Sequence, residues 1–299
     1  MKPKWSGGLA QWVEDDTTFI SVAFTWKLNE AYSWAQFARA LGQKVKIGGP
    51  AVFLNQMKHK VFDVADVGGD YLDAVTKHNP LATFASRGCP VGCWFCIVPA
   101  MEGKEFTLIP DFPVRPVICD NNLSALPDDY QDHIIRRYID EGVKLIDANS
   151  GFEPRTFTTD VYSRWKDLIN EGKGPWRFAY DDMPEGDDAE RVMRMLENEP
   201  SNRKRVYTLI GNEPFDDCMH RIQRVIDMGC EPYAQPLMKL NSLDRRPWVR
   251  FDWTEQLLKD VARWVNGWVW KKAPFSEYSR SAKSPFYCET QTTLFEVSR

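Results

Sequence analysis

The chain has 299 residues, of which 43% are hydrophobic and 27% are charged, and its formal net charge at pH 7 is −4. This composition is typical of a globular protein with a substantial core, and it argues against a protein that grips duplex DNA through a broad basic face. No apolar run approaches the roughly 18 residues of a membrane span, and the first residues include Asp15 and Asp16 without the apolar segment of a secretory signal. We therefore expect a cytoplasmic protein without a membrane partner.

Residues 1–80 are expected to form a small α/β domain. The pattern predicts a strand at 19–25, a helix that opens near Asn29, and a second strand at 45–47 that stops at Gly48-Gly49-Pro50. Gly42 suits the end of the helix. This order is that of a strand–helix–strand unit, so we interpret the segment as a degenerate Rossmann-like fold.

Residues 81–240 alternate between short apolar runs and amphipathic patterns. The strand candidates are 81–85, 116–119, 144–148, 176–180, 206–210 and 232–237, and the helix candidates between them are 127–141, 159–171, 188–199 and 215–228. Asp160 and Asp188 suit helix starts, and Gly142, Gly172 and Gly229 suit helix ends. Repeated strand–helix units predict a parallel α/β sheet that curls into a partial (β/α)6 TIM-like barrel. An open, doubly wound sheet fits the same pattern.

Residues 241–299 differ from the preceding pattern by their tryptophans and a polar end. We expect one helix from Thr254 to about Trp270 and then an irregular tail, together forming an extension that covers the barrel. Trp264 and Trp268, four residues apart, favour a packed helix face, whereas tryptophans beside Lys271-Lys272 are also suited to stacking on nucleobases.

Three of the seven cysteines, Cys89, Cys93 and Cys96, lie within the stretch "GCPVGCWFC" directly after the first strand of the alternating region. An odd number of cysteines without an export signal indicates metal or redox chemistry rather than disulfides. The Cys-x3-Cys-x2-Cys spacing lets one segment ligate three irons of a [4Fe–4S] cluster, leaving the fourth iron for a small molecule. A zinc site with a distant fourth ligand is the alternative.

This loop resembles the signature of the radical S-adenosylmethionine (SAM) enzymes, including the aromatic Phe95 before the last cysteine. The resemblance implies a [4Fe–4S] cluster held by Cys89, Cys93 and Cys96, SAM as cofactor, and a reductant such as flavodoxin or ferredoxin. It also implies reductive cleavage of SAM to a 5′-deoxyadenosyl radical that abstracts a hydrogen atom from the substrate.

The resemblance extends along the later strand ends and implies further site residues. Those assigned to SAM binding are Phe95, Asn121 and Asn122 of "CDNN", Asn149 and Ser150 of "DANSGFEPR", Tyr180 and Asp181 of "RFAYDD", and Gly211 of "YTLIGNEP". The candidate catalytic residues are Tyr180, Asp181 and Arg155. For Asp181 the alternative is helix capping, and for Arg155 it is a surface ion pair.

The branch of the family that is most similar often carries an N-terminal cobalamin-binding domain. The Asp-x-His-x-x-Gly pattern of that domain is missing, and no histidine precedes His59, which argues against cobalamin. Cys288 is either a hydrogen-atom donor or extra ligand, or an ordinary thiol, and the lack of a second cluster spacing favours the ordinary thiol.

The substrate is not encoded in these motifs. One hypothesis is a nucleotide or nucleobase side chain, as in DNA hypermodification or tRNA modification. Another is a small metabolite or peptide in a biosynthetic pathway. An alternative of another class is a non-catalytic iron–sulfur protein for electron transfer or sensing. The reaction class stays open among rearrangement, methylation, dehydrogenation and carbon–carbon bond formation, and so does the oligomeric state.

Overall fold

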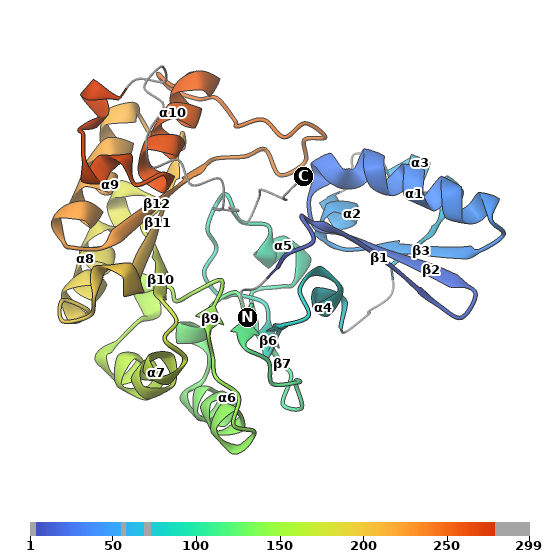
Figure 1. Cartoon of the computed structure of the whole chain (residues 1–299), viewed down its shortest axis with the longest axis horizontal. Helices are drawn as coiled ribbons and strands as arrows, with labels where there is room; N and C mark the ends of the chain where they lie inside the picture. Colours follow the sequence, from blue (N-terminus) through green and yellow to red (C-terminus); the bar gives the residue numbers. More distant parts are fainter. Residues whose placement is uncertain (1–3, 55–57, 69–72, 279–299) are drawn as a thin grey trace. The chain divides into compact units, whose positions relative to one another are not determined.

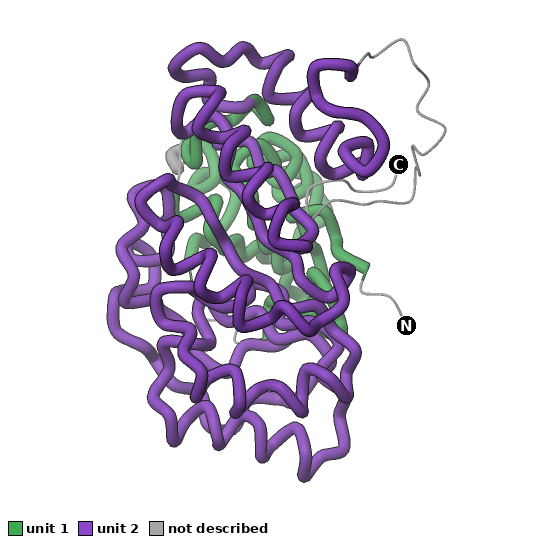
Figure 2. Tube along the Cα trace, turned by 90° about the vertical axis from the view of Figure 1, so that its left-hand side faces the viewer, with its two compact units in different colours: residues 1–82, 239–246, 289–299 green, residues 83–238, 247–288 purple. Residues whose placement is uncertain are grey.

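The structure is a computed structural model of the chain, and it describes residues 4–54, 58–68 and 73–278. The chain divides into two compact units (Figure 2): residues 1–82 and 239–246 belong to the first, and residues 83–238 and 247–288 to the second. None of the helices in the described ranges combines the length and apolar character needed to cross a lipid bilayer. Cys288 lies outside the described residues.

The first unit is a four-stranded sheet with helices packed on it. The sheet order is β1 (Leu9–Glu14), β2 (Thr17–Val22), β3 (Lys44–Gly48) and β4 (Asp66–Val67); β1 is antiparallel to β2, and the remaining pairs are parallel. The helices are α1 (Leu28–Ala40), α2 (Pro50–Leu54), α3 (Lys58–Val64) and α4 (Ala74–His78). The expected strand–helix–strand order is therefore present as β2–α1–β3, and β1 is an addition that the sequence analysis missed.

A shared core holds this unit together. Ala31, Ala35 and Ala38 of α1 pack with Val45 and Ile47 of β3, and all five side chains are buried. The alanines recur at helical spacing on one face of α1, which lets the helix lie close to the sheet. Gly42 ends this helix region with φ 79°, as expected for a left-handed residue after a helix.

The second unit alternates strands and helices in the predicted order. Its strands are β5 (Ala82–Thr83), which begins at the last residue of the first unit, β6 (Ser86–Arg87), β7 (Thr107–Leu108), β8 (Val117–Ile118), β9 (Asp147–Ala148), β10 (Trp176–Ala179), β11 (Lys204–Ile210) and β12 (Glu231–Pro236). Its helices are α5 (Val98–Met101), α6 (Asp128–Asp140), α7 (Thr159–Gly172), α8 (Gly186–Met195), α9 (Phe215–Asp227) and α10 (Glu255–Asn266). Helices α6 to α9 follow one another around the outside of the strands (Figure 1).

The six predicted strands of this region are all present, but they form two sheets instead of one. The orders are β5-β8-β9 and β10-β11-β12, each of three strands, and the pairs β8–β9, β10–β11 and β11–β12 are parallel. The described residues therefore form a mixed α/β fold without a closed barrel, and the partial (β/α)6 barrel is not confirmed. The interruption lies between β9 and β10, where Phe152 N donates to Arg177 O at 2.8 Å and Arg177 pairs with Asp147.

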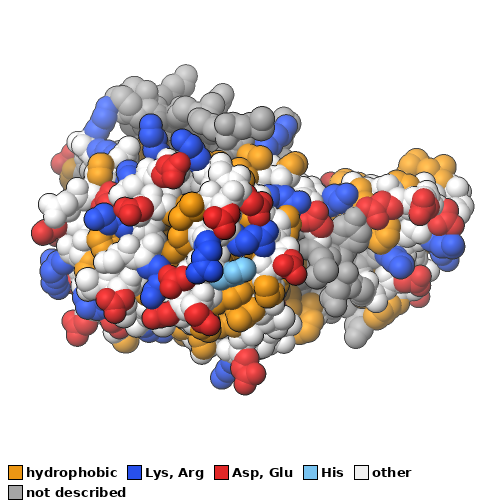
Figure 3. Space-filling model, turned by 90° about the horizontal axis from the view of Figure 1, so that it is seen from below, with side chains coloured by type: hydrophobic (Ala, Val, Ile, Leu, Met, Phe, Trp, Pro, Cys, Tyr) orange, Lys and Arg blue, Asp and Glu red, His pale blue; other side chains and the backbone are white. Residues whose placement is uncertain are grey.

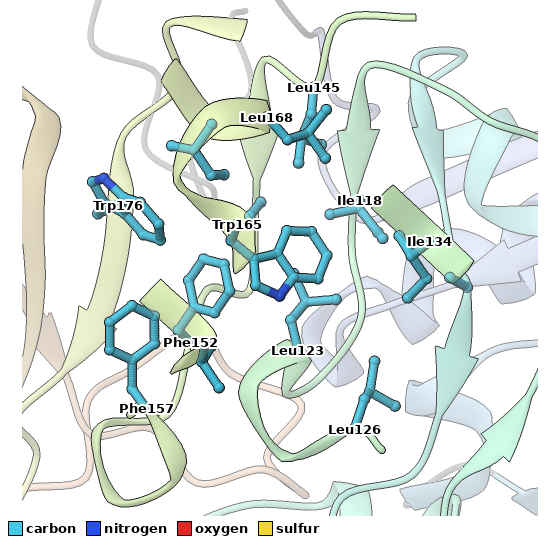
Figure 4. Close-up of a cluster of buried hydrophobic side chains, with 14 of the residues drawn as sticks. Ile118, Leu123, Leu126, Ile134, Leu145, Phe152, Phe157, Trp165, Leu168 and Trp176 are labelled. Carbon is cyan, nitrogen blue, oxygen red and sulfur yellow. The ribbon is translucent and has the colours of Figure 1, made fainter. Parts of the chain in front are cut away.

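An aromatic core fills the space between these strands and helices α6 and α7 (Figure 4). Trp165 and Trp176 are completely buried, and Phe152 lies 5.6 Å from the first ring and 5.4 Å from the second, measured between centroids. Aromatic pairs at these separations stabilise a core beyond their buried area. This core includes residues from both three-stranded sheets, such as Ile118 and Phe178, so it holds the two sheets together.

Several helix ends differ from the predicted caps. Thr158 caps α7, because its side chain accepts a hydrogen bond from Val161 N at 3.3 Å, and Asp160 lies in the first turn. Asp188 likewise lies inside α8, which begins at Gly186. Lys173 takes the left-handed conformation at the end of α7, whereas Gly172 is the last helical residue. The C-terminal helix begins after Thr254 as predicted but ends at Asn266, so Trp268 lies beyond it.

Candidate functional site

The three clustered cysteines lie on a loop that is closed at its base. Strands β6 and β7 pair in antiparallel orientation on either side of the loop, and Cys89 N donates to Gly103 O at 3.3 Å. Gly88 opens the loop with φ 92°, and a Cβ atom there would lie 2.2 Å from Glu105 O. Only glycine satisfies both the positive φ and this close approach, so the loop has a fixed start.

Each of the three sulfur atoms lies beside an N–H group. Asn122 Nδ2 is 3.9 Å from Cys89 Sγ, Arg155 Nη2 is 3.3 Å from Cys93 Sγ, and Val98 N is 3.4 Å from Cys96 Sγ. Cys89 and Cys93 are half-buried and Cys96 is exposed. Partial burial raises the pKa of Cys93 to about 11 and also raises the pKa of Cys96. The three thiols are therefore accessible, and N–H donors are placed to stabilise negative charge on sulfur.

The thiols share one neighbourhood without forming a metal-ligand geometry. The charge of Cys96 affects the pKa of Cys93, and the charge of Cys89 affects that of Cys96. Within the described ranges, no group of three or more His, Cys, Asp or Glu side chains is arranged to hold a metal ion. The donor types nevertheless fit an iron–sulfur cluster, because thiolates are its usual ligands and N–H···S hydrogen bonds tune it.

Asn121 and Asn122 follow β8 and contact the cysteine loop. Asn121 Nδ2 donates to Glu102 Oε2 at 2.7 Å and to Gly88 O at 3.3 Å, so it joins the start of the loop to its far side. Glu102 also accepts from Gly88 N at 3.0 Å and pairs with Arg87. Asn122 is buried and caps the 3₁₀ turn at Leu123–Ala125. Both asparagines, assigned to SAM binding by resemblance, therefore have contacts that position the loop.

Arg155 belongs to a network of charged side chains that follows β9, and it contacts the cysteine loop. Its Nε donates to Glu153 Oε1 at 2.6 Å, and its Nη2 lies 3.3 Å from both Glu185 Oε1 and Cys93 Sγ. Arg155 thus joins the cysteine loop to two carboxylates, and the expected alternative of a surface ion pair is present together with the thiol contact.

Asn149 and Ser150 precede this network. Asn149 N donates to Ile118 O at 2.8 Å, and Ser150 Oγ donates to Cys119 O at 3.3 Å. These contacts extend the pairing of β8 and β9 beyond the strands. Neither side chain reaches the cysteine loop through a contact between described residues.

Tyr180 and Asp181 follow β10 directly but have different surroundings. The ring of Tyr180 is buried with Ala189, Met193 and Val206 in a core cluster, so the structure does not bring it to the cysteines. Asp181 accepts a hydrogen bond from Leu209 N at 2.9 Å, and burial together with the negative charge of Glu185 raises its pKa to about 7. Its charge also raises the pKa of Cys96.

Phe95 and Gly211 are the remaining predicted residues. Phe95 is half-buried on the loop and packs edge-on against Trp94, with ring centroids 5.5 Å apart. Gly211 follows β11 with φ 88°, and a Cβ atom there would lie 2.9 Å from Leu258. Gly211 is therefore packed against α10, and no contact between described residues connects it to the cysteines.

Two buried charged residues that the sequence analysis missed organise the strand ends. Arg221 of α9 is fully buried and donates to Tyr180 O at 2.6 Å, to Leu209 O at 2.8 Å and to Glu213 Oε2 at 3.0 Å. Asp120 accepts from Ala85 N at 2.8 Å and from Ser86 Oγ, and burial raises its pKa to about 7. The signal for Arg221 was its position in the apolar stripe of α9, where Cys218, Ile222 and Val225 are also buried.

The described structure therefore brings together the cysteine loop, Asn121, Asn122, Arg155 and Asp181 with the carboxylates of Glu102, Glu153 and Glu185. No protein-family model matches the chain, and no curated protein sequence matches it either.

Proposed function

We propose that this chain is a radical SAM enzyme whose cluster is held by Cys89, Cys93 and Cys96. The observation that carries the proposal is the cysteine loop itself, closed at its base and with an N–H donor beside each sulfur. Three thiolates on one segment leave one iron of a [4Fe–4S] cluster without a protein ligand. That position is suited to the amino and carboxylate groups of SAM.

When bound, the cluster would supply one electron to the sulfonium of SAM, so that SAM separates into methionine and a 5′-deoxyadenosyl radical that removes a hydrogen atom from the substrate. The chain's own residues would bind and orient. Glu153 and Glu185 both pair with Arg155, so two carboxylates face one guanidinium. This excess of negative charge favours the positively charged ammonium and sulfonium groups of SAM.

The polar contacts around the loop would keep its thiols in place. Asn121 and Glu102 fix the loop start, and Asn122 and Arg155 direct N–H groups at Cys89 and Cys93. Hydrogen bonds to cluster sulfurs stabilise the reduced, more negative state and so raise the reduction potential. The substrate that we favour is a nucleotide or nucleobase, with a small metabolite or peptide as the alternative.

The test is anaerobic purification and reconstitution with iron and sulfide, followed by iron analysis and measurement of 5′-deoxyadenosine after chemical reduction with SAM. We expect a [4Fe–4S] cluster and 5′-deoxyadenosine from the wild-type chain. Cys89→Ser, Cys93→Ser and Cys96→Ser should each lose the cluster and the product.

Cys230→Ser is the matched control, because Cys230 is buried in a different cluster of side chains and its loss should leave iron content unchanged. A wild-type chain that binds zinc instead of iron, or a control that loses iron as completely as the loop variants, contradicts the proposal. A stable cluster that yields no 5′-deoxyadenosine supports the non-catalytic iron–sulfur alternative.

A further inference from the structure

Arg250 lies in the segment 247–253, which follows β12, and three aromatic rings surround its guanidinium: Trp94, Trp248 and Phe251. The segment is anchored at both ends: Trp248 N donates to Leu237 O at 2.7 Å, and the buried Trp253 donates from Nε1 to Glu213 O at 2.8 Å. Asp252 adds a third anchor by accepting from Phe215 N at 3.0 Å. Arg250 therefore projects from a fixed piece of backbone.

The guanidinium of Arg250 lies among three aromatic rings, and no acceptor from the part of the chain that the structure describes contacts it. Its central carbon is 5.3 Å from the Trp94 centroid and 5.0 Å from the centroids of Trp248 and Phe251. Among the described residues, the side chain of Arg250 forms neither a hydrogen bond nor an ion pair, and its backbone carbonyl accepts from Trp253 N at 3.2 Å. Contacts with the rings hold the guanidinium, while its five N–H groups lie at its edge and can donate to an anion.

Two of these rings are exposed to an unusual degree for their size. The exposed fraction is 52% for Trp94 and 57% for Phe251. Phe251 also has a φ of 52°, a left-handed conformation that costs a bulky residue about 1–3 kcal/mol. A strained backbone that presents an aromatic ring to solvent is more typical of a binding surface than of a core.

Trp94 connects this surface to the cysteine loop, since it lies directly after Cys93 in the sequence. Its Nε1 donates to Asp182 Oδ2 at 3.3 Å, which orients the ring while its face stays accessible. Arg250, Trp94 and Phe251 therefore border the loop that carries the three thiols.

We propose that Arg250, Trp94 and Phe251 form a binding site for a phosphate-bearing nucleotide. The N–H groups of Arg250 would donate to phosphate oxygens, and the exposed rings would stack on the base. A neutral aliphatic ligand would leave the cation unpaired, and a simple carboxylate would leave the rings unused. The binding site depends only on these contacts, whereas placing the nucleotide as substrate rests on the proposed function.

Isothermal titration calorimetry of the chain without cluster or SAM tests the site directly. The probes are adenosine monophosphate, adenosine, inorganic phosphate and a short single-stranded oligonucleotide. We expect adenosine monophosphate to bind more tightly than adenosine or phosphate, because only the nucleotide uses both the rings and the cation. An oligonucleotide that binds more tightly than the mononucleotide identifies a strand as the source of the nucleotide, and the reverse order identifies a free nucleotide.

Two variants remove the two components separately. Arg250→Gln should weaken binding of adenosine monophosphate by about tenfold to a hundredfold, the range for hydrogen bonds to charged groups. Phe251→Asn removes the ring but tolerates the positive φ, and it should weaken binding by about tenfold. Arg136→Gln, at an exposed position of α6, makes the same change in net charge and should leave affinity unchanged.

Thermal unfolding of each variant checks that the fold is retained. Equal affinity of wild type and Arg250→Gln, or equal affinity for adenosine and adenosine monophosphate, overturns the proposal. Because the titration contains neither cluster nor SAM, this result is independent of whether the cysteines bind iron.

Discussion

Asp120 ties the segment before the cysteine loop to the end of β8. Its carboxyl group is almost completely buried, and it accepts hydrogen bonds from Ala85 N and Ser86 Oγ. Burial disfavours the charged form of a carboxyl group more than these hydrogen bonds favour it, and its pKa is therefore raised from 3.8 to about 7. The charge state of one side chain thus affects the base of the loop.

Asp120→Asn is expected to change how stability depends on pH. The carboxyl group of Asp120 binds its proton more tightly in the folded state than in the unfolded state. Its contribution to the free energy of unfolding is therefore complete below pH 4 and is lost as the pH rises to about 7. The loss is at most about 4 kcal/mol. Chemical denaturation of wild type and variant should show a stability difference that shifts in favour of the variant across this range.

Asp140→Asn, which removes an exposed carboxylate at the end of α6, is the matched control for that experiment. A difference between wild type and Asp120→Asn that is flat from pH 4 to pH 8 would show that Asp120 is ionised throughout in the folded state.

Arg155 provides a second prediction at this scale, one that depends on the proposed function. Arg155→Gln removes a positive charge and an N–H donor beside Cys93 Sγ, so the reduction potential of a bound cluster should fall. Arg155→Lys keeps the charge and should lower the potential less. A redox titration followed by electron paramagnetic resonance measures both, and equal potentials in all three proteins would contradict a contact between Arg155 and the cluster.

At the scale of elements, the close approach of α7 to the chain before β9 sets a strict limit on side-chain size. A Cβ atom on Gly172 would lie 1.7 Å from Leu145 O. The glycine that the sequence analysis placed as a helix end is therefore required by packing, and the left-handed position belongs to Lys173. Helix-end signals do not distinguish these two roles, because both favour glycine.

Gly172→Ala should destabilise the chain by about 2 kcal/mol, even though alanine is the better helix former, because the helix must shift away from Leu145. Gly142→Ala is the comparison: Gly142 has φ 64° and no atom near its added Cβ, so only about 1 kcal/mol of backbone strain is expected. Urea unfolding of the two variants checks the order, and a larger loss for Gly142→Ala would refute it.

The elements themselves were largely predictable, and their pairing was not. All six apolar runs from 81–85 to 232–237 are strands in the structure, because buried parallel strands are short and continuously apolar. The division into two three-stranded sheets between β9 and β10 has no signal in periodicity, since hydrogen bonding between strands depends on tertiary packing. The hairpin strand β1 was missed because its apolar residues do not alternate with polar ones: Leu9 and Ala10 are adjacent, and so are Trp12 and Val13.

The candidate site was predictable to a similar extent. Cysteine spacing identified the loop, and order along the chain placed Asn121, Asn122 and Arg155 near it. Tyr180 was placed near the loop by the same order along the chain, yet its ring packs against helices α8 and α9. The reason is that successive side chains of an extended segment point to opposite faces. Arg221 was not recognised, because an isolated arginine on an amphipathic helix usually lies on the solvated face.

For the whole molecule, the balance of charge would limit how strongly the proposed nucleotide site could hold a nucleic-acid strand. The chain has 38 Lys and Arg residues against 42 Asp and Glu, and acidic and basic side chains are interspersed on the face shown in Figure 3. A nucleotide held by Arg250 would then contribute about one phosphate contact. The affinity for a single strand should fall with salt with a logarithmic slope of about −0.7. A slope several times steeper, measured by fluorescence anisotropy, would indicate an extended basic surface instead.

The first unit includes residues 239–246 as well as the beginning of the chain. Thr25 is buried, and its hydroxyl group donates to Leu240 O at 3.1 Å and contacts Ser242 O, while Leu243 packs on the core of that unit. During synthesis the N-terminal sheet therefore leaves the ribosome long before its last pieces do. The first unit cannot complete its contacts with residues 239–246 until the intervening second unit has been translated. A chain truncated before residue 239 would therefore lose contacts that stabilise the unit translated first.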